Sequence, residues 1–253
     1  MLNCVSKEEQ LRVYYETLFR EWGCQHWWPA RNRFEVIVGA YLTQNTSWTN
    51  VERALRSLRS AGVLSIGSMR KISLVKLESL VRPAGYFRQK TRRLKTFVAF
   101  LDERYGGSLS RMFAQPTKKL REELLALNGI GPETADSILL YAGQHPVFVV
   151  DAYTRRILDR HNILSANAPY EEIRDLFERA LLKIDPDRND CRGPRFGGAA
   201  HPPSPMSLAT RPPLAQVFND MHGLIVGVGK HYCSKSRPKC DECPLQKFLP
   251  TLK

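Results

Sequence analysis

The sequence lacks long apolar runs. None of its segments contains the 18 or more consecutive apolar residues that a membrane-spanning helix needs. The opening residues, MLNCVSKEEQ, turn charged at Lys7, whereas a secretory signal continues into an apolar stretch. We therefore expect a soluble intracellular protein, located in the cytoplasm, with no membrane partner.

Strand patterns and cysteines are also scarce. No segment shows a convincing alternation of apolar and polar residues, which argues against a sheet protein. Apolar residues recur at helical spacing along most of the chain, which predicts an all-α fold of about ten helices. The six cysteines are too few and too scattered for a disulfide framework, although three of them lie in CSKSRPKCDEC, residues 233–243.

Acidic residues are outnumbered by basic ones. The chain holds 38 Lys and Arg against 25 Asp and Glu, which gives a net charge of +13. Such a surplus favours a polyanionic partner, nucleic acid first and an acidic membrane second, although a soluble protein can be basic without either. Residues 186–213 stand apart, because they hold seven prolines and almost no apolar periodicity. We expect this segment to be a flexible insertion.

A glycine-containing turn joins two predicted helices in LREELLALNGIGPETADSILLYA, residues 120–142. Glycines in the turn allow backbone angles that other residues avoid, and they leave backbone N–H groups accessible to a phosphate. An ordinary helical hairpin without a ligand would show the same pattern. The residues expected to contact DNA here are Asn128, Gly129, Ile130, Gly131 and Thr134.

The chain resembles the helix-hairpin-helix DNA glycosylases of the endonuclease III superfamily. The matching segments are LNGIGPETA for the hairpin, VVDAYTRRI for the family's catalytic aspartate and YLTQNTSWTNV for an early helix pair. The resemblance implies a six-helix barrel domain over residues 26–136 and a second helical domain from residues 1–25 and 137–253. It also implies a nucleoid-associated monomer that acts on double-stranded DNA containing a damaged base.

The resemblance assigns the catalytic role to Asp151. Cleavage of an N-glycosidic bond passes through a cationic sugar, which a nearby carboxylate stabilises while it orients or deprotonates water. Asp151 also precedes a predicted helix, so it could simply be a helix cap, and the two roles are compatible. Bifunctional family members carry a lysine nucleophile where this chain has Glu133, which predicts hydrolysis without a lyase step. Glu133 is either an active-site acid or an ordinary first-turn acid.

Tryptophans suggest the identity of the base. Trp27, Trp28 and Pro29, together with Trp48, match the aromatic base pocket of the 3-methyladenine DNA glycosylase branch. Indole faces favour stacking with an electron-poor, cationic base, although buried tryptophans are more often plain core. Gln44 matches the family glutamine that fills the gap left by the flipped base. The alternatives are a glycosylase with lyase activity for oxidised or mismatched pyrimidines, and a non-catalytic module that binds DNA damage.

Three of the cysteines match the iron–sulfur loop of endonuclease III relatives, in which four thiolates at fixed spacing bind a [4Fe–4S] cluster. Cys233, Cys240 and Cys243 fill the first three places, and Leu249 stands in the fourth. The fourth ligand could be Cys191 or a residue other than cysteine, and a zinc site would face the same shortage. A remnant loop without metal is the remaining alternative.

Overall fold

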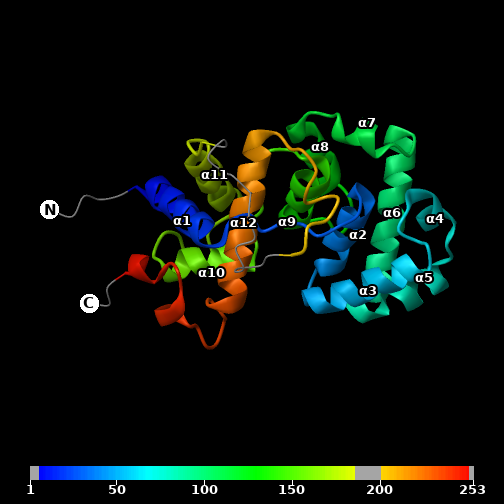
Figure 1. Ribbon diagram of the computed structural model, residues 1–253. Coiled ribbons are helices and arrows are strands. Elements are labelled where there is room, and N and C mark those ends of the chain that lie inside the picture. The colour runs from blue at the N-terminus through cyan, green and yellow to red at the C-terminus, as the bar shows by residue number, and fades with distance from the viewer. Residues whose placement is uncertain (1–5, 186–200, 251–253) are drawn as a thin grey trace. The chain divides into compact units, whose positions relative to one another are not determined.

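The computed structural model describes residues 6–185 and 201–250, and all of its regular elements are helical (Figure 1). The all-α prediction is therefore confirmed for the described residues. The chain separates into two compact units, one formed by Ala30–Gly143 and the other by Met1–Pro29 with Gln144–Lys253. The predicted barrel limits of 26–136 remain a prediction. Among the described residues, no helix combines the length and the apolar character needed to cross a bilayer.

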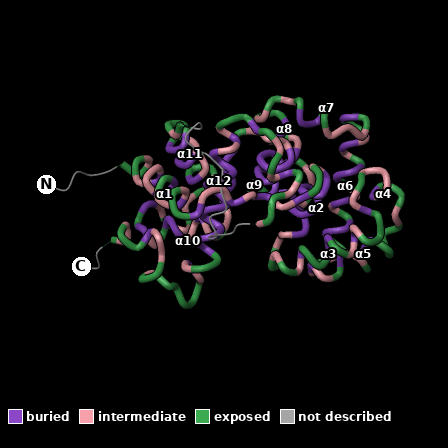
Figure 2. The backbone as a smooth tube through the Cα atoms, viewed as in Figure 1, coloured by how far each residue is buried: buried purple, intermediate pink, exposed green. Residues whose placement is uncertain are grey.

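The 30–143 unit is built around α2, whose residues from Phe34 to Leu42 are all buried (Figure 2). Helix α2 spans Arg33–Thr43, and the other helices of the unit are α3 (Trp48–Ser60), α4 (Ile66–Lys71), α5 (Leu74–Val81), η1 (Arg82–Ala84), α6 (Phe87–Tyr105), α7 (Leu109–Phe113), α8 (Thr117–Leu125), α9 (Pro132–Ser137) and the π-helical η2 (Ile138–Gly143).

A buried lysine fixes the end of α2. Lys90 on α6 donates from its Nζ to the carbonyl oxygens of Leu42, at 2.9 Å, and Ala84, at 2.7 Å. Burial lowers the pKa of Lys90 to about 8. Carbonyls near the end of a helix have no partner within the helix, so the ammonium group satisfies them and anchors the loop that carries Gln44.

The other unit is centred on α12 (Pro213–His231), which is buried along most of its length. It also contains α1 (Lys7–Trp22), α10 (Ala152–Arg160), α11 (Tyr170–Leu181), η4 (Cys240–Glu242) and η5 (Gln246–Phe248). Two glycines allow close approach to α12. A Cβ atom at Gly229 would lie 2.2 Å from the Tyr153 ring of α10, and one at Gly223 would lie 3.1 Å from the Trp27 Cβ. These contacts bring α10 and the Trp27 segment against the same helix.

The proline-rich segment is described only from residue 201 onward. In that part Met206 and Arg211 are buried. The Arg211 guanidinium donates to the carbonyl oxygens of Met206, Ser207 and Ala209, so it closes the turn before α12. Cys191, considered above as a fourth ligand, lies outside the described residues.

Candidate active site

The hairpin joins α8 to α9 as the sequence predicts. Gly129 adopts a φ of 81°, a left-handed value that favours glycine, and Gly131 is the N-cap of α9 with Pro132 directly after it. Ile130 is buried, whereas Asn128, Gly131 and Glu133 are exposed. The hairpin therefore presents backbone and polar groups to solvent while its one aliphatic side chain anchors it.

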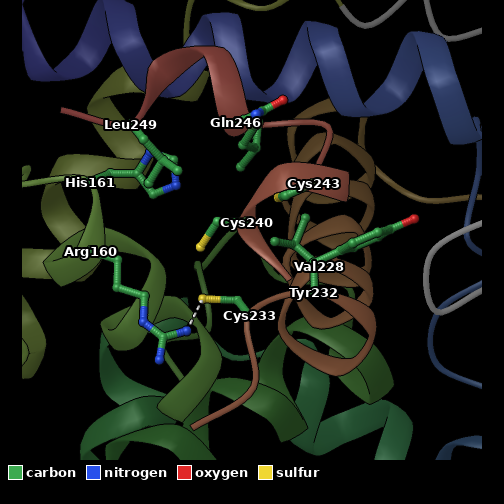
Figure 3. Close-up of a pocket in the computed structure, with 10 residues that line it drawn as sticks. Arg160, His161, Val228, Tyr232, Cys233, Cys240, Cys243, Gln246 and Leu249 are labelled. Carbon is green, nitrogen blue, oxygen red and sulfur yellow. Dashed lines mark hydrogen bonds between the residues drawn. The ribbon is translucent and has the colours of Figure 1, made fainter. Parts of the chain in front are cut away.

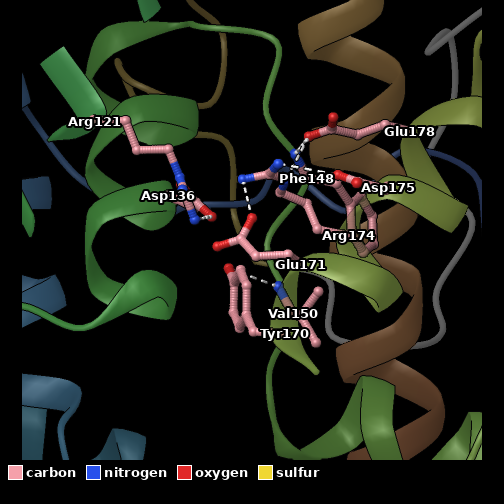
Figure 4. Close-up of polar contacts among 9 residues, drawn as sticks. All are labelled: Arg121, Asp136, Phe148, Val150, Tyr170, Glu171, Arg174, Asp175 and Glu178. Atoms are coloured by element: carbon pink, nitrogen blue, oxygen red, sulfur yellow. Dashed lines mark hydrogen bonds and ion pairs between the residues drawn. The ribbon is translucent and has the colours of Figure 1, made fainter. Parts of the chain in front are cut away.

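One ion pair with two hydrogen bonds links the two helices of the hairpin. Arg121 on α8 donates from Nε and Nη2 to the two carboxylate oxygens of Asp136 on α9, at 2.7 and 3.1 Å (Figure 4). The Asp136 side chain is fully buried. A bidentate pair of this kind fixes the relative orientation of two helices as well as their separation.

Gln44 is tied to the hairpin. Its Nε2 donates to the Gly129 carbonyl oxygen and to Thr134 Oγ1, each at 2.9 Å, and its Oε1 accepts from Arg93 Nη1 at 2.7 Å. Arg93 was not foreseen from the sequence. A Cβ atom at Gly129 would lie 2.0 Å from Arg93 Nε, so a larger residue would displace the Arg93 side chain in addition to straining the backbone at this φ. No local motif points to Arg93, because the contact joins segments far apart in the chain.

Asp151 stands at the N-cap of α10, where a capping box fixes it. Its Oδ1 accepts from the Thr154 backbone N–H at 2.8 Å and from Thr154 Oγ1 at 2.9 Å. The preceding extended segment is held by α11: the Phe148 N–H donates to Glu178 Oε1 at 2.9 Å and the Val150 N–H to the Tyr170 hydroxyl at 3.2 Å (Figure 4). The carboxylate is thus positioned from both sides along the chain.

A histidine faces the other oxygen of this carboxylate. His222 Nε2 on α12 lies 3.7 Å from Asp151 Oδ2, and the two side chains are 5% and 14% exposed. Burial lowers the pKa of His222, and the Asp151 carboxylate partly opposes that effect. His222 was also missed from the sequence, where it appears as a single polar residue in the apolar stretch MHGLIVGVG.

The predicted base-pocket tryptophans fall in different units. Trp27 and Trp28 are buried, with their rings edge to face at 5.6 Å, and Pro29 is half-buried. The Trp27 ring also lies 5.4 Å from that of His201 and 6.3 Å from that of His222. Trp48 begins α3 in the other unit, half-buried, and its indole N–H donates to Glu52 at 2.9 Å. Trp27 therefore lies in the same neighbourhood as His222 and, through it, Asp151.

The three cysteines of the C-terminal loop line one pocket, together with Arg160, His161 and Leu249 (Figure 3). Arg160 Nη1 donates to Cys233 Sγ at 3.1 Å, and burial raises the pKa of the Cys243 thiol. The His161 Nδ1 shares a hydrogen bond of 2.7 Å with the Tyr14 hydroxyl.

These residues do not fit a four-thiolate cluster. The fourth family position is occupied by Leu249, whose side chain has no metal-binding atom. Within residues 6–185 and 201–250, no three His, Cys, Asp or Glu side chains are grouped closely enough to hold a metal ion. The loop thus keeps three thiols without the complete donor set of an iron–sulfur site.

Known proteins match this chain over most of its length. Residues 38–182 match the family model described as HhH-GPD superfamily base excision DNA repair protein. A Methanocaldococcus jannaschii protein, provisionally named a DNA repair glycosylase, is 38% identical over 96% of this chain and 97% of its own. The endonuclease III of Thermotoga maritima is 27% identical over 84% of this chain and 80% of its own.

A solved structure gives the same result for the fold. The 3-methyladenine DNA glycosylase of H. pylori, bound to 1,N6-ethenoadenine, superimposes with a TM-score of 0.68 and 28% identity, covering 89% of this chain and 97% of that one. The family match covers more than half of the sequence, and it includes the hairpin and the Asp151 segment. The chain therefore belongs to the HhH-GPD superfamily of base excision DNA repair proteins and is a DNA repair glycosylase.

Proposed function

We propose that this glycosylase hydrolyses the N-glycosidic bond of an alkylated purine in double-stranded DNA and leaves an intact abasic site. The observation that carries the proposal is the fixed carboxylate of Asp151. One of its oxygens is held by Thr154, and the other points away from the capping box toward His222. A carboxylate held in this way can stabilise a cationic sugar without first having to be oriented.

The reaction needs water as its nucleophile under this proposal. Glu133 occupies the hairpin place at which bifunctional relatives carry a lysine, and a carboxylate cannot form a Schiff base. Glu133 is exposed in the first turn of α9, where the helix dipole favours an acid. Asp151 is then the residue that orients or deprotonates the attacking water.

The choice of an alkylated purine rests on the aromatic residues. Trp27, Trp28, Pro29 and Trp48 match the pocket positions of the 3-methyladenine glycosylase branch, and the H. pylori member of that branch is 28% identical to this chain. A cationic base is attracted to an indole face, and its glycosidic bond is already weakened. Stacking together with the Asp151 carboxylate would then be sufficient for excision.

The runner-up acts on oxidised or mismatched pyrimidines. It is favoured by the similarity to the endonuclease III of T. maritima, at 27% identity. A module that only binds damaged DNA would have no need of the Asp151 carboxylate, and the family match argues against it.

For the C-terminal loop we propose that the purified protein carries no cluster, or only a labile one. Two observations support this proposal. Leu249 has no metal-binding atom, and among the described residues no three His, Cys, Asp or Glu side chains lie close enough together to bind a metal ion. The loop would then serve DNA binding through its basic residues, Lys235, Arg237 and Lys239, all of which are exposed.

Excision assays on defined lesions test the substrate. Methylated DNA is compared with thymine-glycol and G·T-mismatch duplexes, and alkali is then used to cut the abasic sites. We expect release of methylpurines, and release of the pyrimidines alone would refute the proposal in favour of the runner-up. Trp48→Ala should slow methylpurine release by about 5- to 150-fold, because a stacking partner contributes roughly 1–3 kcal/mol. Trp48→Ala should slow the release of a neutral damaged base by a smaller factor.

A further inference from the structure

The carboxylate of Asp151 divides its two oxygens between two neighbours. Oδ1 is engaged by the Thr154 N–H and hydroxyl, at 2.8 and 2.9 Å. Oδ2 has His222 Nε2 at 3.7 Å, beyond ordinary hydrogen-bond distance but close enough to shorten by a small side-chain rotation. Catalytic contacts are often long in the unliganded protein and shorten when the substrate binds.

His222 sits in an enclosed, mainly apolar setting. The Phe148 ring packs against it edge to face at 6.2 Å, and the Trp27 ring lies 6.3 Å away. The next residue is Gly223, where even a Cβ atom would lie 2.9 Å from the Gln25 Cβ. The His222 side chain is only 5% exposed, so protein atoms enclose the imidazole.

Charged and titratable groups stand on several of the segments near this histidine. Asp151 faces it from α10, and Glu178 of α11 accepts a hydrogen bond from the Phe148 N–H. His201 lies on the Trp27 ring. On α12 itself stands Asp220, whose pKa burial raises to about 7. Of these groups, Asp151 lies within ion-pair distance of His222.

A histidine beside Asp151 can donate a hydrogen bond to the carboxylate without neutralising its charge. A permanent cation would neutralise the charge, and an apolar residue could not donate. As a neutral imidazole it donates from Nε2–H to Oδ2 and leaves the carboxylate its full negative charge. Once protonated it forms an ion pair with Asp151 and cancels much of the field that stabilises the cationic sugar. A lysine or arginine in place of His222 would cancel this field at every physiological pH, because its side chain is always charged.

We propose that His222 is the positioning residue of Asp151, holding the carboxylate in its active orientation as a neutral donor and inactivating it on protonation. This inference rests on the proposed role of Asp151. The fall of the excision rate at low pH, the acid limb of the pH profile, is then caused by protonation of His222. Because burial keeps His222 neutral until the pH falls below the usual range of histidine, the enzyme is fully active at neutral pH and loses activity as the pH falls through the pKa of His222.

Single-turnover excision from pH 5 to pH 8, on the lesion duplex processed fastest, tests the proposal. His222→Gln keeps a neutral donor that does not titrate, so we expect a rate within about tenfold of wild type at pH 7 and no fall at acid pH. His222→Phe keeps the volume without the donor, and it should slow excision roughly 10- to 100-fold at every pH, as a misplaced catalytic group does. An unchanged acid limb in His222→Gln, or a wild-type rate in His222→Phe, overturns the proposal.

Two control variants isolate the effect. His201→Gln removes another histidine, whose ring lies beside that of Trp27, and Asp220→Asn removes a carboxyl on α12 whose pKa is raised to about 7 by burial. Each should keep the acid limb of the wild type. A loss of that limb in either variant assigns it to another group and overturns the proposal.

The same experiment separates this inference from the proposed function. If Asp151→Asn excises normally, the role of Asp151 fails, and the role of His222 fails with it. If Asp151→Asn is inactive while His222→Gln keeps the wild-type acid limb, only the inference fails. NMR titration of the His222 ring gives a readout independent of activity and of the His222 variants. The pKa of His222 should fall in Asp151→Asn, because the carboxylate raises it, and an unchanged pKa overturns the coupling.

Discussion

The two ends of α10 can be compared directly, because both face α12 or the loop that follows it. At the N-terminal end, Asp151 is bonded by Thr154 and faced by His222. At the C-terminal end, Arg160 donates to Cys233, and His161 lines the pocket of the three cysteines (Figure 3). The first end is a complete arrangement around one carboxylate. The second keeps three thiols, and Leu249 stands at the fourth family position in the sequence.

The difference shows that a site formed by a few neighbouring residues tolerates sequence change better than a site that needs four donors at once. The capping box of Asp151 needs only a threonine three residues later, and one neighbouring helix supplies His222. A cluster site needs four donors at fixed spacing, so one apolar replacement leaves the other three thiols without a common ligand. Each end can be tested by a substitution that either removes what is complete or restores what is missing.

The largest effect is expected at the N-terminal end. Asp151→Asn removes the charge that is proposed to stabilise the sugar cation, and we expect excision to fall by roughly 10²- to 10⁴-fold while duplex binding stays unchanged. Asp159→Asn on the same helix is the matched control, since Asp159 is exposed and its carboxylate accepts a hydrogen bond from the Ala166 N–H at 2.9 Å, a bond that the asparagine amide oxygen can keep. Excision rates and binding isotherms are measured side by side. Normal excision by Asp151→Asn would exclude this end of α10 as the active site.

The second prediction concerns covalent chemistry. The wild type should give no stoichiometric adduct when borohydride is added during turnover, because Glu133 cannot act as an amine nucleophile. Glu133→Lys restores the family's lysine and should produce a trapped protein–DNA adduct, with Glu122→Lys in the exposed part of α8 as the control. An adduct of the wild type at full yield would show that another lysine attacks the sugar.

The third prediction restores the missing ligand at the C-terminal end. Leu249→Cys completes the four-thiolate spacing, and an anaerobic preparation should then bind up to about four irons per chain with absorption near 400 nm. The wild type should bind far less. Cys233→Ser in the Leu249→Cys background removes another ligand and should abolish the gain. A wild type that already carries a stable cluster with four irons would contradict the proposal that the cluster is absent or labile.

The sequence predicts the parts of this protein that depend on neighbouring residues. The helices, the turn at Gly129 and the cap at Asp151 follow from local patterns, and the structure confirms them. The contacts of Arg93 with Gly129 and of His222 with Asp151 join distant segments, so no local pattern predicts them. The functional roles of the site residues, including Gln44, remain predictions, although the structure adds that Gln44 is bonded to the hairpin.

The smallest effects on activity and stability are expected when one hydroxyl group is removed near each end of α10. Thr154→Val deletes the Oγ1 bond to Asp151 but keeps the backbone N–H bond. Tyr14→Phe deletes the hydroxyl that Gln10 and the buried His161 share, at 2.8 and 2.7 Å. Each variant should lower the free energy of unfolding by about 1–2 kcal/mol, since one hydrogen bond contributes a net of about 1 kcal/mol and the Tyr14 hydroxyl takes part in two.

The two variants should differ in activity. Thr154→Val loosens the carboxylate that is proposed to be catalytic, and a loss of about 1 kcal/mol in the transition state slows excision by about fivefold. Tyr14→Phe touches only the cysteine end, so its excision rate should equal that of the wild type despite the similar loss of stability. Thermal unfolding and single-turnover excision are measured on both proteins. Equal slowing by the two variants would mean that stability alone, and not the position of Asp151, sets the rate, and the contrast between the two ends of α10 would then have no functional meaning.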